Sequence, residues 1–302
     1  WDYDQDGDQD LYLAGRYCHA FFENQGERFV DQSAELFGSL IPEDYPEVFV
    51  AAAEDFNQDG LDDLYLGRWD KQDYILLNQG GKKFSTKGLD FGLNMEIGIV
   101  KPYENTMGLG VVDIWDDGYP DLLIGTGDPH DDSRDILLCN KQGQGFERCS
   151  DLLHFHSSPH DKTRAHGVAF GDIDRDGDND IYLNLGGHPL HDHAHQILGD
   201  EYESRETGKL FVQQEPSDHN TAALELRGTI SNADAIGARI TVTGSQTRYY
   251  TVRSAQAFQS QNSRRMIMTL GGDEMREVHV DWPSGLSSSF TLHKGEEKLL
   301  VE

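Results

Sequence analysis

Residues 2–10 read Asp-Tyr-Asp-Gln-Asp-Gly-Asp-Gln-Asp, and the chain repeats this nine-residue pattern three more times. The further copies are DFNQDGLDD at 55–63, DIWDDGYPD at 113–121 and DIDRDGDND at 172–180. With one exception, oxygen-bearing side chains occupy positions 1, 3, 5 and 9, and position 6 is always glycine. Oxygen donors spaced in this way around a sharp turn are typical of a calcium loop. One copy would fit an ordinary acidic surface turn, but four copies predict calcium binding.

The predicted ligands follow from these positions, with position 7 contributing its main-chain carbonyl. They are Asp2, Asp4, Asp6, Asp8 and Asp10; Asp55, Asn57, Asp59, Leu61 and Asp63; Asp113, Asp117, Tyr119 and Asp121; and Asp172, Asp174, Asp176, Asp178 and Asp180. The exception is the third loop, where Trp115 has no side-chain oxygen and a water or Asp116 would have to substitute. The sequence therefore predicts three to four Ca²⁺ ions.

The residues that follow each loop argue against an EF-hand. That motif requires a bidentate glutamate at position 12. Position 12 is instead apolar in every copy: Leu13, Leu66, Ile124 and Leu183. Alternating apolar stretches follow the loops, and small apolar stretches such as 50–53 and 109–112 precede them. Strand, acidic turn and strand predict a β-hairpin around each site.

The ninth loop positions, residues 10, 63, 121 and 180, are spaced by 53, 58 and 59 residues. Three repeats also carry an Asn–Gly turn between apolar runs, at 24–26, 78–80 and 140–143. This adds a second hairpin, so each repeat offers about four strands, the content of one propeller blade. In the fourth repeat the longer segment 199–209 replaces that turn and precedes Leu210-Phe211.

These repeats resemble FG-GAP/VCBS repeats, the calcium-loop blades of integrin-α-like propellers. That resemblance implies seven blades, and we therefore expect further blades before Trp1, with a smaller closed or open array as the alternative. From about residue 216 the repeats stop. The stretches 231–239 (SNADAIGAR), 253–261 and 278–285 (VHVDWPSG) closely resemble the ASPIC/UnbV domain of the cartilage-acidic-protein-like family.

The resulting prediction is an all-β chain of two parts. Residues 1–215 form β-propeller-type calcium-binding blades, and residues 216–302 form a C-terminal β-sandwich-like domain. The resemblance is specific for architecture, and it implies a secreted calcium-binding or matrix-type protein.

The net charge of −29 argues against nucleic-acid binding and against anionic membranes. No apolar run reaches the ~18 residues of a membrane span. Weak calcium loops function best where calcium is plentiful, so we expect an extracellular or cell-surface location. The many loop carboxylates repel one another, and chelation of calcium is expected to loosen the chain.

Two of the three cysteines, Cys139 and Cys149, flank the turn at 141–145. A hairpin centred on residue 144 would place them opposite one another, which predicts a cross-strand disulfide; the alternative is two unpaired strand residues. Cys18 has no evident partner. No CxxC motif is present, so a zinc knuckle or c-type haem has no support.

Histidines cluster on either side of the fourth loop. One group is His154, His156 and His160, and the other is His188, His191, His193 and His195. In an extended segment, alternate residues point to one side, so the second group could supply imidazole ligands for Cu²⁺ or Zn²⁺. The alternative is a solvent-facing loop that is rich in histidine by chance or for pH response.

No catalytic motif such as Gly-x-Ser-x-Gly occurs. The leading hypothesis is a secreted or surface-displayed, non-catalytic calcium-binding module that binds a protein or a glycan, or associates with itself. Trp69, Trp115 and Tyr119 offer a stacking platform for a sugar, although such residues more often fill gaps between blades. The alternatives are a transition-metal protein that captures metal or catalyses through the histidines, and a subunit or coat of an extracellular fibre.

Overall fold

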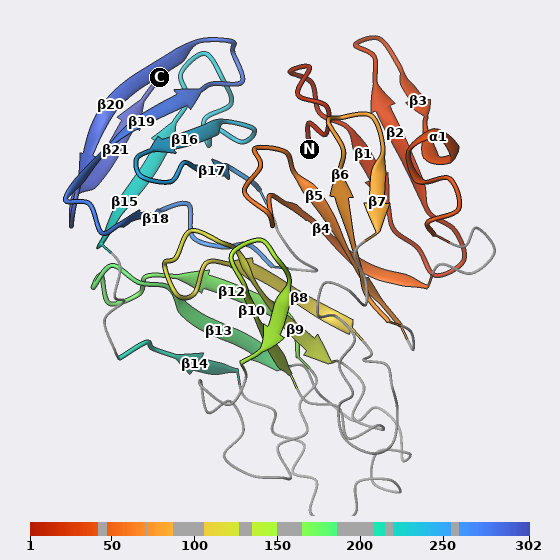
Figure 1. Ribbon diagram of the computed structural model, residues 1–302, viewed down its shortest axis with the longest axis horizontal. Helices are drawn as coiled ribbons and strands as arrows, with labels where there is room; N and C mark the ends of the chain where they lie inside the picture. Colours follow the sequence, from red (N-terminus) through yellow and green to blue (C-terminus); the bar gives the residue numbers. More distant parts are fainter. Residues whose placement is uncertain are drawn as a thin grey trace, which may run out of the picture.

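A computed structural model describes residues 1–41, 47–69, 72–86, 106–126, 135–149, 165–185, 208–214, 220–254 and 260–302. These residues form six β-sheets and one short helix, α1 (Ser33–Phe37). Figure 1 shows four sheets in succession along the chain, with the C-terminal strands beside them. The predicted all-β class is confirmed.

We call the first four sheets blades 1 to 4. Blade 1 contains β1 (Leu11–Leu13), β2 (Ala20–Asn24) and β3 (Phe29–Asp31). Blade 2 contains β4 (Val48–Glu54), β5 (Asp63–Arg68), β6 (Tyr74–Asn78) and β7 (Phe84–Thr86). Blade 3 contains β8 (Thr106–Val112), β9 (Asp121–Thr126), β10 (Ile136–Asn140) and β11 (Phe146–Arg148). Blade 4 contains β12 (Ala165–Gly171), β13 (Asp180–Leu185) and β14 (Lys209–Phe211).

The acidic loops at 55–63, 113–121 and 172–180 each join two antiparallel strands. These are the hairpins that the sequence predicts. Blade 4 differs from the prediction in one respect. The sequence predicts that segment 199–209 replaces the last turn of the repeat, so that Leu210-Phe211 would follow as its last strand. Instead β14 pairs directly with β13, with Ile181 opposite Phe211, and so fills the third place in the sheet.

Apolar side chains alternate along the blade strands, and both faces of the inner blades are buried. In β5, Leu64 and Leu66 pack towards blade 1, whereas Tyr65 packs towards blade 3. Three separate cores result, one between each pair of consecutive blades. This face-to-face stacking is the packing of propeller blades. Within the described residues the blades do not close a ring.

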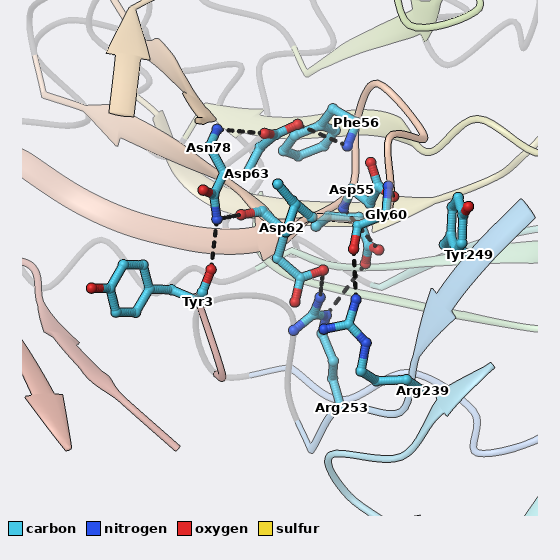
Figure 2. Close-up of polar contacts among 12 residues, drawn as sticks. Tyr3, Asp55, Phe56, Gly60, Asp62, Asp63, Asn78, Arg239, Tyr249 and Arg253 are labelled. Atoms are coloured by element: carbon cyan, nitrogen blue, oxygen red, sulfur yellow. Dashed lines mark hydrogen bonds and ion pairs between the residues drawn. The ribbon is translucent and has the colours of Figure 1, made fainter. Parts of the chain in front are cut away.

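Buried asparagines tie neighbouring blades together. Nδ2 of Asn78 donates to the carbonyl of Asp62 in its own blade, and also to the carbonyl of Tyr3 in blade 1, at 2.7 Å (Figure 2). Asn140 repeats this arrangement in blade 3 and donates to the carbonyl of Phe56 in blade 2 at 2.9 Å. The Asn–Gly turns of blades 2 and 3 therefore also form the link to the preceding blade.

The C-terminal part contains two sheets that enclose one core. Its strands are β15 (Asn220–Arg227), β16 (Arg239–Thr243), β17 (Arg248–Thr251), β18 (Met266–Gly271), β19 (Met275–Asp281), β20 (Ser287–His293) and β21 (Glu297–Val301). Leu224 and Met268 from one sheet and Ile240 and Val280 from the other meet in this core, as in a β-sandwich. The predicted boundary after residue 215 lies at a segment outside the described residues.

The side chain of Glu302 occupies a cradle of hydrogen-bond donors in this part. It accepts from the backbone N–H groups of Thr229, Ile230 and Ser231 and from the hydroxyls of Ser231 and Ser284. Desolvation opposes ionisation here. The hydroxyls of Ser284 and Ser231 and the N–H groups nevertheless outweigh it and lower the pKa of Glu302 to about 2.

We expect Asn140→Ala to lower the free energy of unfolding by about 2–3 kcal/mol, because the buried carbonyls of Phe56 and Pro120 lose their donor. Asn24→Ala is the matched control, since Asn24 is only half-buried and donates to Gln9 within its own blade. Urea denaturation measures both changes. Equal losses in the two variants would contradict an inter-blade role for this asparagine.

We expect the stability difference between the native chain and Glu302→Gln to depend on pH. The pKa of Glu302 is lower in the folded than in the unfolded chain. Its contribution is therefore complete above the unfolded value, near 4.5, and is lost as the pH falls through about 2. Denaturation of both proteins is measured between pH 6 and pH 2, in steps of ~1 pH unit or less, and gives the stability difference at each pH. A difference that does not change with pH would contradict the assigned anion cradle.

Candidate metal loops and the domain docked on them

The four acidic loops have one backbone conformation. The residue at position 4 adopts a positive φ in every loop: Gln5 at 63°, Gln58 at 55°, Asp116 at 54° and Arg175 at 64°. The glycine at position 6 also has a positive φ throughout: Gly7, Gly60, Gly118 and Gly177 lie between 86° and 101°. Glycine adopts this region at little cost, which explains its recurrence at position 6.

The aspartate at position 1 organises each turn. In the first loop its two carboxylate oxygens accept the backbone N–H groups of Asp6 and Gly7, both at 3.1 Å. Asp55, Asp113 and Asp172 do the same for positions 5 and 6 of their own loops. This folds the chain back on itself, so the side chains at positions 1 and 3 approach the end of the loop.

The aspartate at position 9 connects the loop to the sheet. One oxygen of Asp63 accepts the N–H of Phe56 at 3.2 Å, and the other accepts the N–H of Asn78, in β6, at 2.8 Å (Figure 2). The same two bonds recur at Asp10, Asp121 and Asp180. In blade 4, the N–H at the end of the third strand comes from Gln213, which replaces the asparagine. All four position-9 residues are buried.

The first and fourth loops bring three carboxylates together. Ligand oxygens of Asp2, Asp4 and Asp10 lie within 4.8 Å of one another, as do those of Asp172, Asp174 and Asp180. In the fourth loop Asp178 is 4% exposed, and its buried Oδ1 has no hydrogen-bond partner among the described residues. Oxygen donors of this kind suit a hard divalent cation, and the donor set therefore fits calcium.

Burial is the main cause of the raised pKa values in these loops. It raises the pKa of Asp178, which lies beside Asp176, to about 7. It likewise raises the pKa of Asp55 to about 8, that of Asp113 to about 7 and that of Asp10 to about 6. A nearby cation favours the ionised form of a carboxyl and opposes this effect.

The second and third loops offer fewer oxygens. In the second loop, position 3 is Asn57, whose side-chain amide is hydrogen-bonded to Asp59. Position 7 of this loop is Leu61, which has no side-chain oxygen. In the third loop the indole N–H of Trp115 donates to Sγ of Cys139 at 2.9 Å, so the side chain packs beside the disulfide. The third loop therefore lacks a side-chain oxygen at position 3.

Cys139 and Cys149 form a disulfide, with their Cα atoms 5.9 Å apart. Their geometry differs from the expected hairpin centred on residue 144. Cys139 lies opposite Glu147, and the N–H of Cys149 donates to the carbonyl of Leu137. The hairpin is therefore centred on residue 143, and the cysteines are diagonal neighbours on one face of the sheet, within reach of each other.

The histidines predicted to bind a transition metal lie outside the described residues. These are His154, His156, His160, His188, His191, His193 and His195. The histidine site stays a prediction.

Family models match two parts of the chain. The FG-GAP-like repeat matches residues 55–124 and 113–183, and the ASPIC and UnbV model matches residues 228–302. The chain thus contains FG-GAP-like repeats followed by an ASPIC/UnbV domain. The loop at 2–10 lies before the matched residues but has the same geometry as the others. A search of curated proteins finds no match. Among the described residues, no helix has the length and apolar character to cross a membrane.

The ASPIC/UnbV domain docks on the loops of the FG-GAP blades. At the second loop, the side chain of Gln58 accepts the N–H of Tyr249 at 2.8 Å and donates to the carbonyl of the same residue at 3.2 Å. Arg239 donates to the carbonyl of Gly60 at 2.6 Å (Figure 2). The acceptors in these contacts are two main-chain carbonyls and the side-chain amide of Gln58.

The third and fourth loops make equivalent contacts. Arg248 donates to the carbonyl of Asp117 at 3.0 Å, and its guanidinium carbon lies 4.3 Å from the ring centre of Tyr119. At the fourth loop Arg265 contacts Oδ2 of Asp172 at 2.6 Å. Sequence reasoning missed these arginines. Their only signal in the sequence is their positive charge in an otherwise acidic chain.

Arg253 makes the most buried of these contacts. Its guanidinium lies 2.6 Å from a carboxylate oxygen of Asp62 and 3.5 Å from one of Glu54, at the end of β4, and all three side chains are nearly inaccessible (Figure 2). A buried carboxylate without its cation is strongly destabilising. This ion cluster therefore stabilises the docked arrangement of the ASPIC/UnbV domain on blade 2.

We expect Arg253→Met to lower the free energy of unfolding by about 3–5 kcal/mol, because it leaves buried carboxylates without their cation. Arg264→Met is the control: Arg264 pairs with Asp234 at an exposed position, and its loss is expected to cost less than about 1 kcal/mol. Denaturant unfolding at constant calcium measures both. Similar costs would show that the buried cluster adds nothing beyond an exposed pair.

Proposed function

We propose that this FG-GAP-repeat protein is a calcium-stabilised, non-catalytic recognition module that acts outside the cell or on its surface. FG-GAP repeats and an ASPIC/UnbV domain fit an extracellular or surface recognition module. The observation that carries the calcium part is the fourth loop, where three carboxylates converge and the buried Oδ1 of Asp178 has no partner among the described residues.

The loop residues would hold the ion in defined roles. Asp172, Asp174, Asp180 and, at position 5, Asp176 would supply carboxylates. Asp178 at position 7 would supply the main-chain carbonyl that the sequence predicts, and its buried Oδ1 is a further oxygen in the same loop. Bound calcium supplies positive charge that offsets their mutual repulsion. Asp180 also accepts the N–H groups of the loop and of the third strand, so ion binding and strand pairing share one residue. The proposed role of calcium is therefore architectural.

The docked ASPIC/UnbV domain restricts where a protein or glycan partner can bind. Arg248 lies over Tyr119, and Trp115 points to Cys139, so two of the three aromatic residues considered for sugar stacking are used in internal packing. The blade faces and edges away from the loops are therefore the proposed recognition surfaces.

Removal of calcium tests this proposal. We expect EGTA to lower the melting temperature, because an ion that binds only the folded chain stabilises it by about 2.7 kcal/mol per site at a hundredfold excess over Kd. Differential scanning calorimetry with added calcium, and then with EGTA, measures the shift. An unchanged melting temperature would refute architectural calcium.

A substitution in the fourth loop tests whether that loop is a calcium site. We expect Asp174→Asn to lower the number of tightly bound calcium ions by one in titration calorimetry, since it removes a converging carboxylate of the fourth loop. Glu27→Gln, at an exposed residue of the turn between β2 and β3, is the control for loss of one negative charge and should retain every ion. Equal losses would point to nonspecific binding.

A further inference from the structure

The ASPIC/UnbV domain contacts the acidic loops at the same part of the turn. Arg239 donates to the carbonyl at position 6 of the second loop. Thr221 donates at 2.9 Å to the same position, Gly177, of the fourth loop. In the third loop the carbonyls at positions 4 and 5 accept hydrogen bonds from Thr269 and Arg248. All of these acceptors lie between position 4 and position 6 of their loops.

The same peptide units bond to loop carboxylates on their other side. In a trans peptide the N–H and C=O groups point in opposite directions. In the third loop, Asp113 accepts the N–H groups of positions 5 and 6, so the carbonyls of positions 4 and 5 point towards the domain. In the second and fourth loops, the N–H at position 7 bonds to the carboxylate at position 5, and the carbonyl at position 6 meets the domain.

The side chain of Gln58 makes docking depend on the shape of the second loop. It bonds to both main-chain groups of Tyr249, on the edge strand β17. Gln58 has a φ of 55°. A positive φ is uncommon for a residue other than glycine, and it persists where the surrounding contacts enforce it. The contact with Tyr249 therefore requires the turn that the carboxylates of this loop hold.

We propose that cation binding to the loops and docking of the ASPIC/UnbV domain reinforce one another. The aspartates at positions 1 and 5 are predicted calcium ligands, and they hold the peptide units that the domain contacts. Docking therefore preorganises these carboxylates, and a preorganised site binds more tightly because less conformational freedom is lost. Such coupling is reciprocal, so each event strengthens the other by the same factor. The inference rests on the proposed function, since it requires calcium in the loops.

The coupling makes attachment of the domain depend on calcium. The ASPIC/UnbV domain has a core of its own, enclosed by its two sheets and separate from the cores between the blades. Loss of the contacts with the loops therefore leaves this core intact. Withdrawal of calcium frees the domain from the blades before the domain itself unfolds.

Hydrogen exchange in the full chain measures docking and domain folding separately. The N–H of Tyr249 donates to the second loop, and the N–H of Ser263 donates to a carbonyl of β12, so both amides report docking. The amides of Ile240 and Val280, buried in paired strands, report folding of the domain. Replacement of calcium by EGTA should speed exchange of the first two by about fivefold or more and leave the second two unchanged. Equal acceleration of all four amides, or no acceleration in a chain that binds calcium, would overturn the coupling.

Thr221→Val tests the reverse direction, because it removes the donor to Gly177 without changing the charge. It should weaken calcium binding at the fourth loop by about two- to tenfold in titration calorimetry, the range for one neutral hydrogen bond. Thr229→Val is the matched control, since its hydroxyl bonds to the main-chain carbonyl of Glu302 within the domain. This control should bind calcium like the native chain. In an Asp174→Asn chain, which lacks the site, Thr221→Val should have no further effect on calcium binding.

The outcomes separate this inference from the calcium proposal. If calcium binds Thr221→Val as tightly as the native chain, or both threonine variants are weakened alike, the coupling is wrong and architectural calcium remains. If the native chain binds no calcium, the proposed function fails and the coupling fails with it. Arg265, whose positive charge lies beside Asp172, is present in every variant and cannot cause a difference between them.

Discussion

The arrangement of the blades depends on one buried group, the aspartate at loop position 9. Asp63 has both oxygens occupied by backbone N–H groups, one from the loop and one from β6. A buried carboxylate is costly unless hydrogen bonds or cations satisfy it. Because the same residue joins turn, second strand and third strand in every blade, the acidic loop and the β-sheet cannot form independently of one another.

Charge compensation explains how so acidic a chain folds. The ASPIC/UnbV domain contributes arginines to the loops of blades 2, 3 and 4, and Arg265 contacts a carboxylate at position 1. Arg239 and Arg248 instead contact main-chain carbonyls, which leaves the carboxylates of those loops available. The loop face is thus both the candidate cation face and the docking face of the ASPIC/UnbV domain.

Much of this fold could be predicted from local patterns. The hairpins around the loops follow from the spacing of Asp and Gly, and the Asn–Gly turns mark the second hairpin of each blade. Contacts between distant segments could not be predicted in this way. The position of β14 depends on pairing across a long connection, and the register of Cys139 depends on a turn that is centred one residue earlier than expected. The pairing of Arg253 with Asp62 spans 191 positions, with no local signal in the sequence.

The repeat itself determines which faces stay open. A blade buries both of its faces only when it has a neighbour on each side. Asn78 and Asn140 show that neighbouring blades are also linked by polar contacts, through carbonyls at loop position 2. The carbonyl of Ile173 occupies that position in blade 4. The side chain of Ile173 is 58% exposed, whereas the corresponding Phe56 and Ile114 are buried, so among the described residues this face of blade 4 lacks the cover that the inner blades have.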